Sequence, residues 1–213
     1  MEKELKKRIL SSIIILPLSL FFLIKGSFLF ILFLIILFLL ACLEWSKMNK
    51  KIEYKIIGIF FLLLSFSSVY FVRNRDLLEF LIILTICITT DIGGYVFGKI
   101  LKGPKLTKIS PNKTYSGMFG GFLFSIVVTC IIVEKYETYF LESQNYLEDL
   151  SFILVIFSIS GVSQIGDLII SYFKRMSKIK DTGNLFPGHG GVLDRIDGMI
   201  FVFPFVYLIL KIL

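Results

Sequence analysis

The stretch Ser27–Leu43, SFLFILFLIILFLLACL, contains no charged side chain. The hydrocarbon core of a bilayer is about 30 Å thick, and a helix needs about 20 apolar residues to cross it. A run this apolar and nearly this long predicts a membrane-spanning helix. We therefore expect an integral membrane protein.

Similar apolar blocks occur along the rest of the chain. Together they predict seven spans, at Ile9–Ile24, Ser27–Leu43, Ile56–Val72, Leu77–Phe97, Gly117–Val133, Phe152–Phe173 and Met199–Leu213. The first block is not predicted to be a cleaved signal peptide, because Pro17 lies within it and no small-residue cleavage site follows. No repeat or soluble domain interrupts the pattern, so residues 1–213 are interpreted as one all-α, polytopic membrane domain.

The composition agrees with this class. Hydrophobic residues make up 56% of the chain, against roughly 45–50% in soluble domains. This excludes a disordered chain, a disulfide-stapled secreted scaffold and an ordinary cytosolic enzyme. The three cysteines, Cys42, Cys87 and Cys130, lie in apolar runs at no metal-ligand spacing. We interpret them as small buried hydrophobic residues.

The basic residues predict the orientation of the spans. The chain has 23 Lys and Arg and a net charge of +7. With the N-terminus inside, all basic residues lie in inner segments except Lys25, Arg73, Arg75, Lys135 and Lys211. This bias is the positive-inside pattern and predicts an N-in, C-out topology in the cell inner membrane. The two long loops, Lys99–Ser116 and Lys174–Gly198, are then cytoplasmic.

Two carboxylates fall inside predicted spans. Asp91 lies late in the fourth span and Asp167 late in the sixth, where a charge normally needs a partner, a polar cavity or an ion. The sixth span also carries polar residues at three- and four-residue steps: Ser160, Ser163, Gln164, Asp167, Ser171 and Lys174. On a helix these form one stripe, which is either a hydrogen-bonded seam between helices or the wall of a wet cavity. Gly117 and Gly121, a G-x-x-x-G pair, favour close helix packing.

The last inner loop has the residue types of a phosphate site. Residues 171–198 read SYFKRMSKIKDTGNLFPGHGGVLDRIDG. Cationic side chains at Lys174 and Arg175 can neutralise phosphate oxygens, and a glycine-rich loop lets backbone amides approach an anion. Asp194 and Asp197 are spaced i, i+3, which suits Mg²⁺ held by carboxylates and substrate phosphates. The alternatives are that the cations only anchor anionic lipid and that the aspartates only cap the last helix.

Residues 171–197 resemble the signature of the phosphatidate cytidylyltransferases, also called CDP-diacylglycerol synthases. The matching residues are Ser171, Lys174, Arg175, Lys180, Asp181, Gly183, Phe186, Pro187, His189, Gly190, Gly191, Asp194, Arg195 and Asp197. The stretch Asp91–Lys99 is similar to an upstream helix of that family. Ile109–Gly117 resembles a further motif but departs from it at Asn112, Tyr115 and Ser116.

The resemblance implies that phosphatidate attacks the α-phosphorus of CTP in a Mg²⁺-dependent reaction. CDP-diacylglycerol forms, pyrophosphate leaves, and the active site faces the cytoplasm at the membrane interface. The implied catalytic residues are Ser171, Lys174, Arg175, His189, Asp194 and Asp197; Lys180, Gly190, Gly191, Arg195 and Lys113 would bind the nucleotide. Asp167, Asp194 and Asp197 would hold the metal, with Asp91 a secondary candidate. The expected partners are CTP, phosphatidate and the bilayer, with no nucleic acid, and a homodimer is left open.

Other classes fit less of the sequence. A transporter using Asp91 and Asp167 as ion-coupling sites leaves the signature loop unexplained. A CDP-alcohol phosphotransferase would need an Asp-Gly-rich pattern that the sequence lacks, and a purely structural membrane protein would not need the loop.

Overall fold

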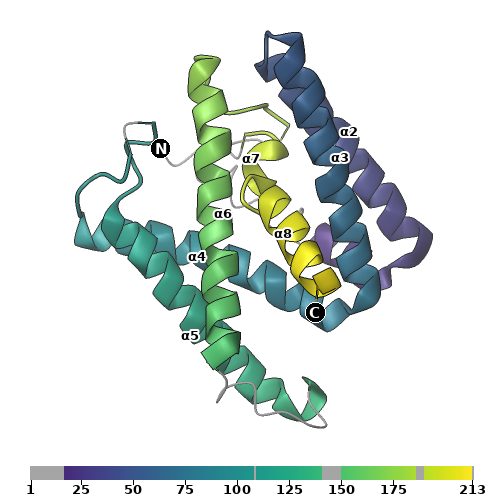
Figure 1. The fold of residues 1–213 in the computed structure, drawn as a ribbon, viewed down its shortest axis with the longest axis vertical. Coiled ribbons are helices and arrows are strands. Elements are labelled where there is room, and N and C mark those ends of the chain that lie inside the picture. The colour runs from purple at the N-terminus through teal and green to yellow at the C-terminus, as the bar shows by residue number, and fades with distance from the viewer. Residues whose placement is uncertain (1–16, 108, 141–149, 186–189, 213) are drawn as a thin grey trace.

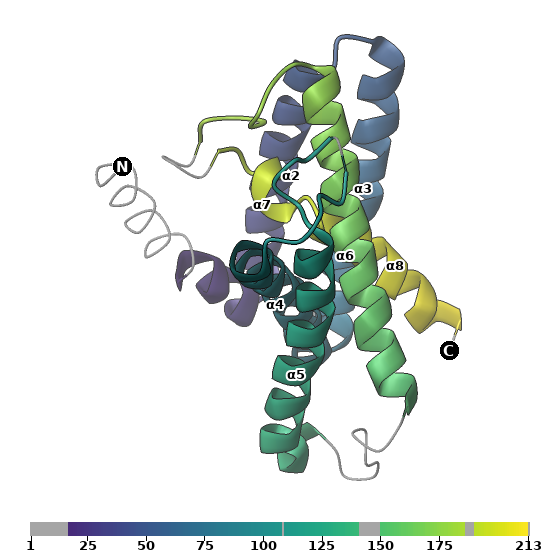
Figure 2. The ribbon, with the colours of Figure 1, turned by 90° about the vertical axis from the view of Figure 1, so that its left-hand side faces the viewer.

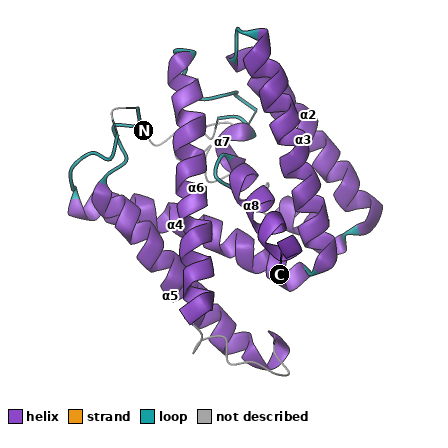
Figure 3. Cartoon of the chain, viewed as in Figure 1, coloured by secondary structure: helices purple, strands orange, loops and turns teal. Residues whose placement is uncertain are grey.

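The structure, a computed structural model, describes residues 17–107, 109–140, 150–185 and 190–212. Its helices are α2 (Ser27–Met48), α3 (Ile52–Arg75), α4 (Leu77–Leu101), α5 (Tyr115–Phe140), α6 (Leu150–Met176), α7 (Leu193–Ile196) and α8 (Met199–Ile212). A further helical segment, residues 17–25, precedes α2. The described part of the chain contains an isolated bridge between Lys105 and Thr114 but no strand (Figure 3). The prediction of an all-α fold is confirmed.

In the part of the chain that the structure describes, five helices are long and apolar enough to cross a membrane. These are α2, α3, α4, α5 as far as Lys135, and α6. The polytopic prediction is therefore confirmed. Helix α8 has 14 residues and is about 21 Å long at about 1.5 Å per residue, which is shorter than the bilayer core. The first half of the predicted first span, Ile9–Ile24, lies outside the described residues, so the count of seven and the orientation stay predictions.

Helix α8 lies between α3 and α6 (Figure 1). Two apolar clusters meet there. One joins α2 and α3 to α7 and the start of α8, and includes Phe30, Leu62 and Leu193. The other joins α4 and α6 to α8, and includes Phe80 and Ile156. The three cysteines carry free thiols and pack in these clusters, with Cys87 buried, as their interpretation predicted.

Helices α4 and α5 form the most extensive pair in the fold, and glycines let them approach. A Cβ atom on Gly93 would lie 2.6 Å from the carbonyl oxygen of Gly120, and one on Gly117 would lie 2.7 Å from that of Gly94. No side chain fits at such distances from backbone. The packing interpretation of Gly117 and Gly121 is confirmed, and Gly121 itself faces Thr90 of α4.

The end of α6 turns the chain back toward α7. The Ile179 amide donates to the Lys174 carbonyl oxygen and the Lys178 amide to that of Arg175, each at 3.0 Å. Lys178 has φ 57°. These are the two hydrogen bonds and the left-handed residue of a Schellman motif. The motif starts the return of the chain toward α2, where residues 179–185 and 190–192, here called the signature loop, contact Glu44 through Thr182 and Val192 (Figure 2).

Candidate functional site

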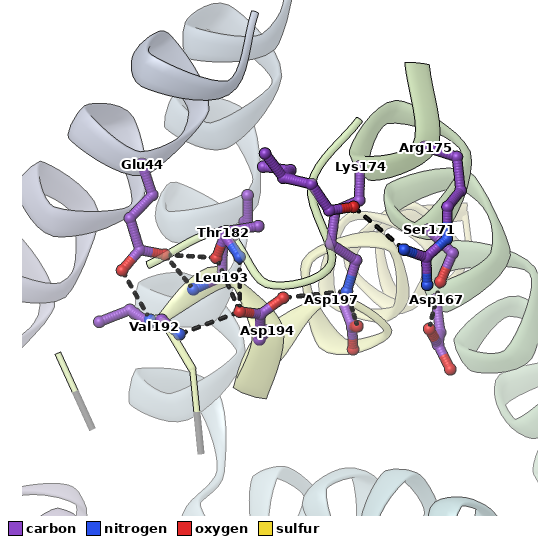
Figure 4. Close-up of polar contacts among 12 residues, drawn as sticks. Glu44, Asp167, Ser171, Lys174, Arg175, Thr182, Val192, Leu193, Asp194 and Asp197 are labelled. Atoms are coloured by element: carbon purple, nitrogen blue, oxygen red, sulfur yellow. Dashed lines mark hydrogen bonds and ion pairs between the residues drawn. The ribbon is translucent and has the colours of Figure 1, made fainter. Parts of the chain in front are cut away.

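A buried carboxylate from α2 holds the signature loop in place. Glu44 is 8% exposed. It accepts hydrogen bonds from the backbone amides of Val192 and Leu193, each at 2.9 Å, and from the Thr182 hydroxyl at 2.8 Å (Figure 4). The two amides belong to the start of α7, where backbone donors have no partner within the helix. Glu44 therefore fixes both the loop and the first turn of α7 to α2.

Asp194, in the first turn of α7, uses both carboxylate oxygens. Oδ2 accepts from the Thr182 amide at 2.8 Å, the Gly191 amide at 2.9 Å and the Thr182 hydroxyl at 3.0 Å, while Oδ1 accepts from Lys174 Nζ at 2.9 Å. Burial acts to raise the pKa of Asp194, but the Gly191 hydrogen bond and the Lys174 ammonium outweigh it, so its pKa lies below the ordinary value. The group is held ionised.

Lys174 joins the two aspartates of α7. Its side chain is only 11% exposed, and Nζ lies 2.9 Å from Asp194 Oδ1 and 4.0 Å from Asp197 Oδ2. The i, i+3 spacing thus turns both carboxylates the same way, as the sequence predicted, and the group between them here is the Lys174 ammonium. Lys174 comes from the last turn of α6, so this contact also ties α6 to α7.

A second ion pair lies beside the first. Lys113, in the loop before α5, pairs with Asp167 of α6, whose Oδ1 also accepts from the Ser171 hydroxyl at 3.2 Å. Burial raises the pKa of Asp197 well above its ordinary value, and the charge of Asp167 raises it further, while Lys174 partly offsets both. The carboxylates of Asp167 and Asp197 therefore share a region with more negative than positive charge.

The remaining predicted residues are distributed around this centre. Arg175 is exposed and donates to the carbonyl oxygens of Ile109 at 3.4 Å and Ile179 at 3.1 Å, so it braces two loops. Lys180, Asp91 and Arg195 are exposed, and Arg195 lines an apolar cavity beside α7. His189 lies outside the described residues.

Contacts within the protein itself explain why residues 190 and 191 are glycines. Gly190 has φ 85°, and a Cβ atom there would lie 2.6 Å from Asp194 Oδ2. A Cβ atom on Gly191 would overlap the Glu44 carboxylate. These glycines let the loop pass between two carboxylates.

The first half of the polar stripe of α6 is the hydrogen-bonded seam that the sequence gave as one alternative, and its wet-cavity alternative stays a prediction. Toward its start, Ser160 accepts from the Thr90 hydroxyl of α4 at 2.8 Å, and Gln164 donates to the Met118 carbonyl oxygen of α5 at 3.4 Å. This half is a seam between helices. Toward its end, Asp167, Ser171 and Lys174 face the ion pairs described above.

The donor set fits a hard cation. Among the described residues no group of three Asp, Glu, His or Cys side chains is arranged to hold a metal. Mg²⁺, however, usually takes one or two protein carboxylates together with substrate phosphates and water. Three carboxyl groups, of Asp167, Asp194 and Asp197, meet only two ammonium groups, of Lys113 and Lys174, and burial together with the Asp167 charge raises the pKa of Asp197. This excess favours a cation at the site.

Sequence reasoning missed Glu44 and Thr182. One signal was present: Glu44 ends a long apolar run, FLLACLEW, much as Asp91 and Asp167 lie in theirs. No spacing rule connects Glu44 to a loop about 140 residues later, because only the tertiary fold joins them.

Comparison with known proteins agrees with this arrangement. A family model described as the cytidylyltransferase family matches residues 50–213. A phosphatidate cytidylyltransferase of Rickettsia bellii is 34% identical over 98% of this chain and 91% of its own length. That of Rickettsia felis is 35% identical over 95% and 90%, and that of Bacillus subtilis is 38% identical over 66% and 51%. With its signature loop fixed between α2 and α6, the chain belongs to the cytidylyltransferase family.

Proposed function

We propose that this chain is a phosphatidate cytidylyltransferase: it transfers the cytidylyl group of CTP to phosphatidate, giving CDP-diacylglycerol and pyrophosphate. A phosphate oxygen of phosphatidate forms a bond to the α-phosphorus of CTP, and the bond from that phosphorus to the bridging oxygen of pyrophosphate breaks. The observation that carries the proposal is the cluster of Lys113 and Lys174 with Asp167, Asp194 and Asp197, all of which lie within the range that the family model matches.

Both substrates are anions, so their repulsion must be offset before they can meet. Lys174 and Lys113 are the buried or half-buried cations of the cluster, and each is now paired with a carboxylate. We infer that these ammonium groups turn to phosphate oxygens when substrates bind. Fixed cations at the developing charge are the main requirement of phosphoryl-type transfer.

Mg²⁺ is the proposed cofactor, held by Asp194 and Asp197 with Asp167. When bound, it would neutralise phosphate charge and act as a Lewis acid. The carboxylates released from the two lysines would be its ligands. Ser171, which donates to Asp167, would orient that carboxylate. Arg175, Lys180, Arg195 and His189 remain proposed contacts for phosphate.

We further propose that this cluster faces the cytoplasm in the cell inner membrane. CTP is a charged, water-soluble nucleotide, so its site has to open to the compartment that holds it. The basic residues of the loops before α5 and after α6 support that side.

The direct test uses the purified protein in detergent with CTP, dioleoyl phosphatidate and Mg²⁺. We expect release of pyrophosphate together with a CDP-lipid product. A protein that moved ions instead would release no pyrophosphate, and absence of product with a folded protein would overturn the proposal.

Asp194→Asn tests the metal assignment. We expect activity to fall by at least about a hundredfold and the binding of Mn²⁺, followed by electron paramagnetic resonance, to weaken. Glu53→Gln is the matched control, because Glu53 is an exposed carboxylate in the first turn of α3. Near-normal activity and Mn²⁺ binding in Asp194→Asn would refute the assignment.

A further inference from the structure

An apolar cavity of about 400 Å³ lies beside α7, whose Arg195 and Ile196 are part of its lining. Side chains of residues 17–25, α2, α3, α4 and α8 line it, among them Leu23, Leu34, Phe66 and Ile88. This volume is within the range of about 300–1,000 Å³ that is usual for small-molecule sites.

The cavity has a single charged residue among its described lining, and that residue is Arg195. Arg195 and Ile196 belong to α7 and directly follow Asp194. Helix α7, which carries Asp194, is therefore part of the cavity wall, and apart from two serines the rest of the described lining is apolar. A cation in the wall of an apolar cavity is complementary to a phosphate that carries an acyl chain.

A second cavity of about 410 Å³ provides a contrast. It lies between α4, α6 and α8, and its described lining includes Asp76 and Glu79 but no basic residue. Negative charge there would repel a lipid phosphate. The two cavities are of similar size, so the charge at the lining distinguishes the one that suits an anionic lipid.

We propose that the cavity beside Arg195 holds one acyl chain of the phosphatidate substrate while Arg195 contacts its phosphate. This inference rests on the proposed function and adds to it the position of the lipid. The acyl chain of the lipid enters between α2, α3 and α4. The lipid phosphate then lies within reach of Asp194 and Lys174. The second acyl chain stays in the bilayer.

Lipid tails are as apolar as the cavity wall, so moving a chain from the bilayer into the cavity gains little hydrophobic energy. The cavity acts through shape and position: it holds the lipid so that its phosphate stays at α7. A bulky side chain in the cavity should thus impair long-chain substrates and spare those too short to reach it.

Ile88→Trp is the test variant, since Ile88 lines the cavity and is 46% exposed, which leaves room for a larger side chain. We expect kcat/KM for dioleoyl phosphatidate to fall by about tenfold. With dibutanoyl phosphatidate it should stay within about twofold, and the KM for CTP should not change. Ile131→Trp is the matched control, because Ile131 is an exposed α5 residue outside the cavity lining.

A second measurement does not depend on turnover. Phosphatidate with a photoreactive diazirine at the end of one acyl chain is irradiated with the wild-type protein, and labelled peptides are identified. We expect labels on the cavity-lining parts of α2, α3 and α4, reduced in Ile88→Trp and retained in Ile131→Trp. The same probe on phosphatidylcholine should label these positions weakly.

Equal labelling by both lipids would mean that bulk lipid fills the cavity, and this result would overturn the inference. So would equal kinetics of the two tryptophan variants toward dioleoyl phosphatidate. Failure of the proposed function is a different result: the wild-type protein would then convert neither the long-chain nor the dibutanoyl substrate.

Discussion

At the scale of single residues, Glu44 has the most demanding position. A buried carboxylate is costly unless it is fully hydrogen-bonded, and Glu44 meets this condition with donors that all come from the signature loop and α7. The Thr182 hydroxyl lies within hydrogen-bond distance of both Glu44 and Asp194. It has one proton and can donate to only one of them at a time. The support of the loop and the position of Asp194 are therefore coupled.

Glu44→Gln is expected to lower stability by about 2–3 kcal/mol. Each carboxylate oxygen of Glu44 accepts a hydrogen bond from a backbone amide. In glutamine one of these oxygens is replaced by an NH₂ group, which would face a backbone N–H donor and could not accept its hydrogen bond. Because Glu44 also holds the first turn of α7, which carries Asp194, kcat should fall by about tenfold or more. Melting temperature in detergent and kcat at a permissive temperature measure the two effects.

Trp45→Phe is the control for a purely structural effect. Trp45 is the next residue of α2, is 6% exposed, and donates from its indole to the Tyr54 carbonyl oxygen at 2.8 Å. We expect its melting temperature to fall with little change in kcat. If Glu44→Gln also lost stability alone, Glu44 would have no role in positioning Asp194.

Lys174→Gln should separate charge from packing within the cluster. It removes the cation that Asp194 and Asp197 share, but Asp194 keeps its three contacts to Thr182 and Gly191. We expect kcat/KM to fall by about a hundredfold with a native-like melting profile. Lys47→Gln, at an exposed position of α2, should retain activity in the same assay. Loss of activity in both variants would indicate a general effect of charge.

At the scale of helices, the packing of α4 on α5 depends on glycine. Gly93→Ala would place a methyl group 2.6 Å from the Gly120 carbonyl oxygen, so the helices must separate. We expect a loss of about 1–3 kcal/mol, measured by unfolding in detergent. Gly161→Ala, in α6, meets only Phe122 ring atoms at 3.7 Å and beyond. Since alanine favours helix over glycine by about 1 kcal/mol, it should be neutral or stabilising, and equal losses in both variants would contradict the packing argument.

The helices were predictable where composition alone decides. The runs that correspond to α2 to α6 are predominantly apolar, and a bilayer requires such runs to be helical. The predicted spans were shorter than the helices that contain them, since α3 already begins at Ile52 and α4 extends to Leu101. Polar and glycine residues at those ends continue the backbone hydrogen bonding although they do not add to hydropathy.

The candidate site was predictable only in part. Spacing within one helix correctly predicted that Asp194 and Asp197 point the same way, because local geometry fixes i, i+3 neighbours. The Lys113–Asp167 pair and the Glu44 contacts join segments far apart in the chain. Such pairs follow from how α2, α5 and α6 pack, which a single sequence does not state.

At the scale of the whole molecule, the basic segments gather at one end. The turn between α2 and α3 and the end of α6 line a common cleft that includes Lys50, Lys51 and Lys178. Arg175 reaches the loop before α5 through Ile109. Segments that the charge pattern assigned to one side of the membrane are thus neighbours in space. This proximity agrees with their lying on a common side of the membrane; which side that is stays a prediction, which a cysteine-labelling experiment can test.

Ser177, after α6, and Asn74, at the far end of α3, should lie on opposite sides of the membrane. In a variant lacking Cys42, Cys87 and Cys130, we expect Asn74→Cys to react with an impermeant maleimide applied outside spheroplasts. Ser177→Cys should react only after the membrane is permeabilised, because a positively charged end of the bundle is retained inside. The reverse pattern would place the ion-pair cluster outside, away from cytoplasmic CTP. Since Ser177 lies three residues after Lys174, this labelling reports on the side of the proposed reaction centre itself.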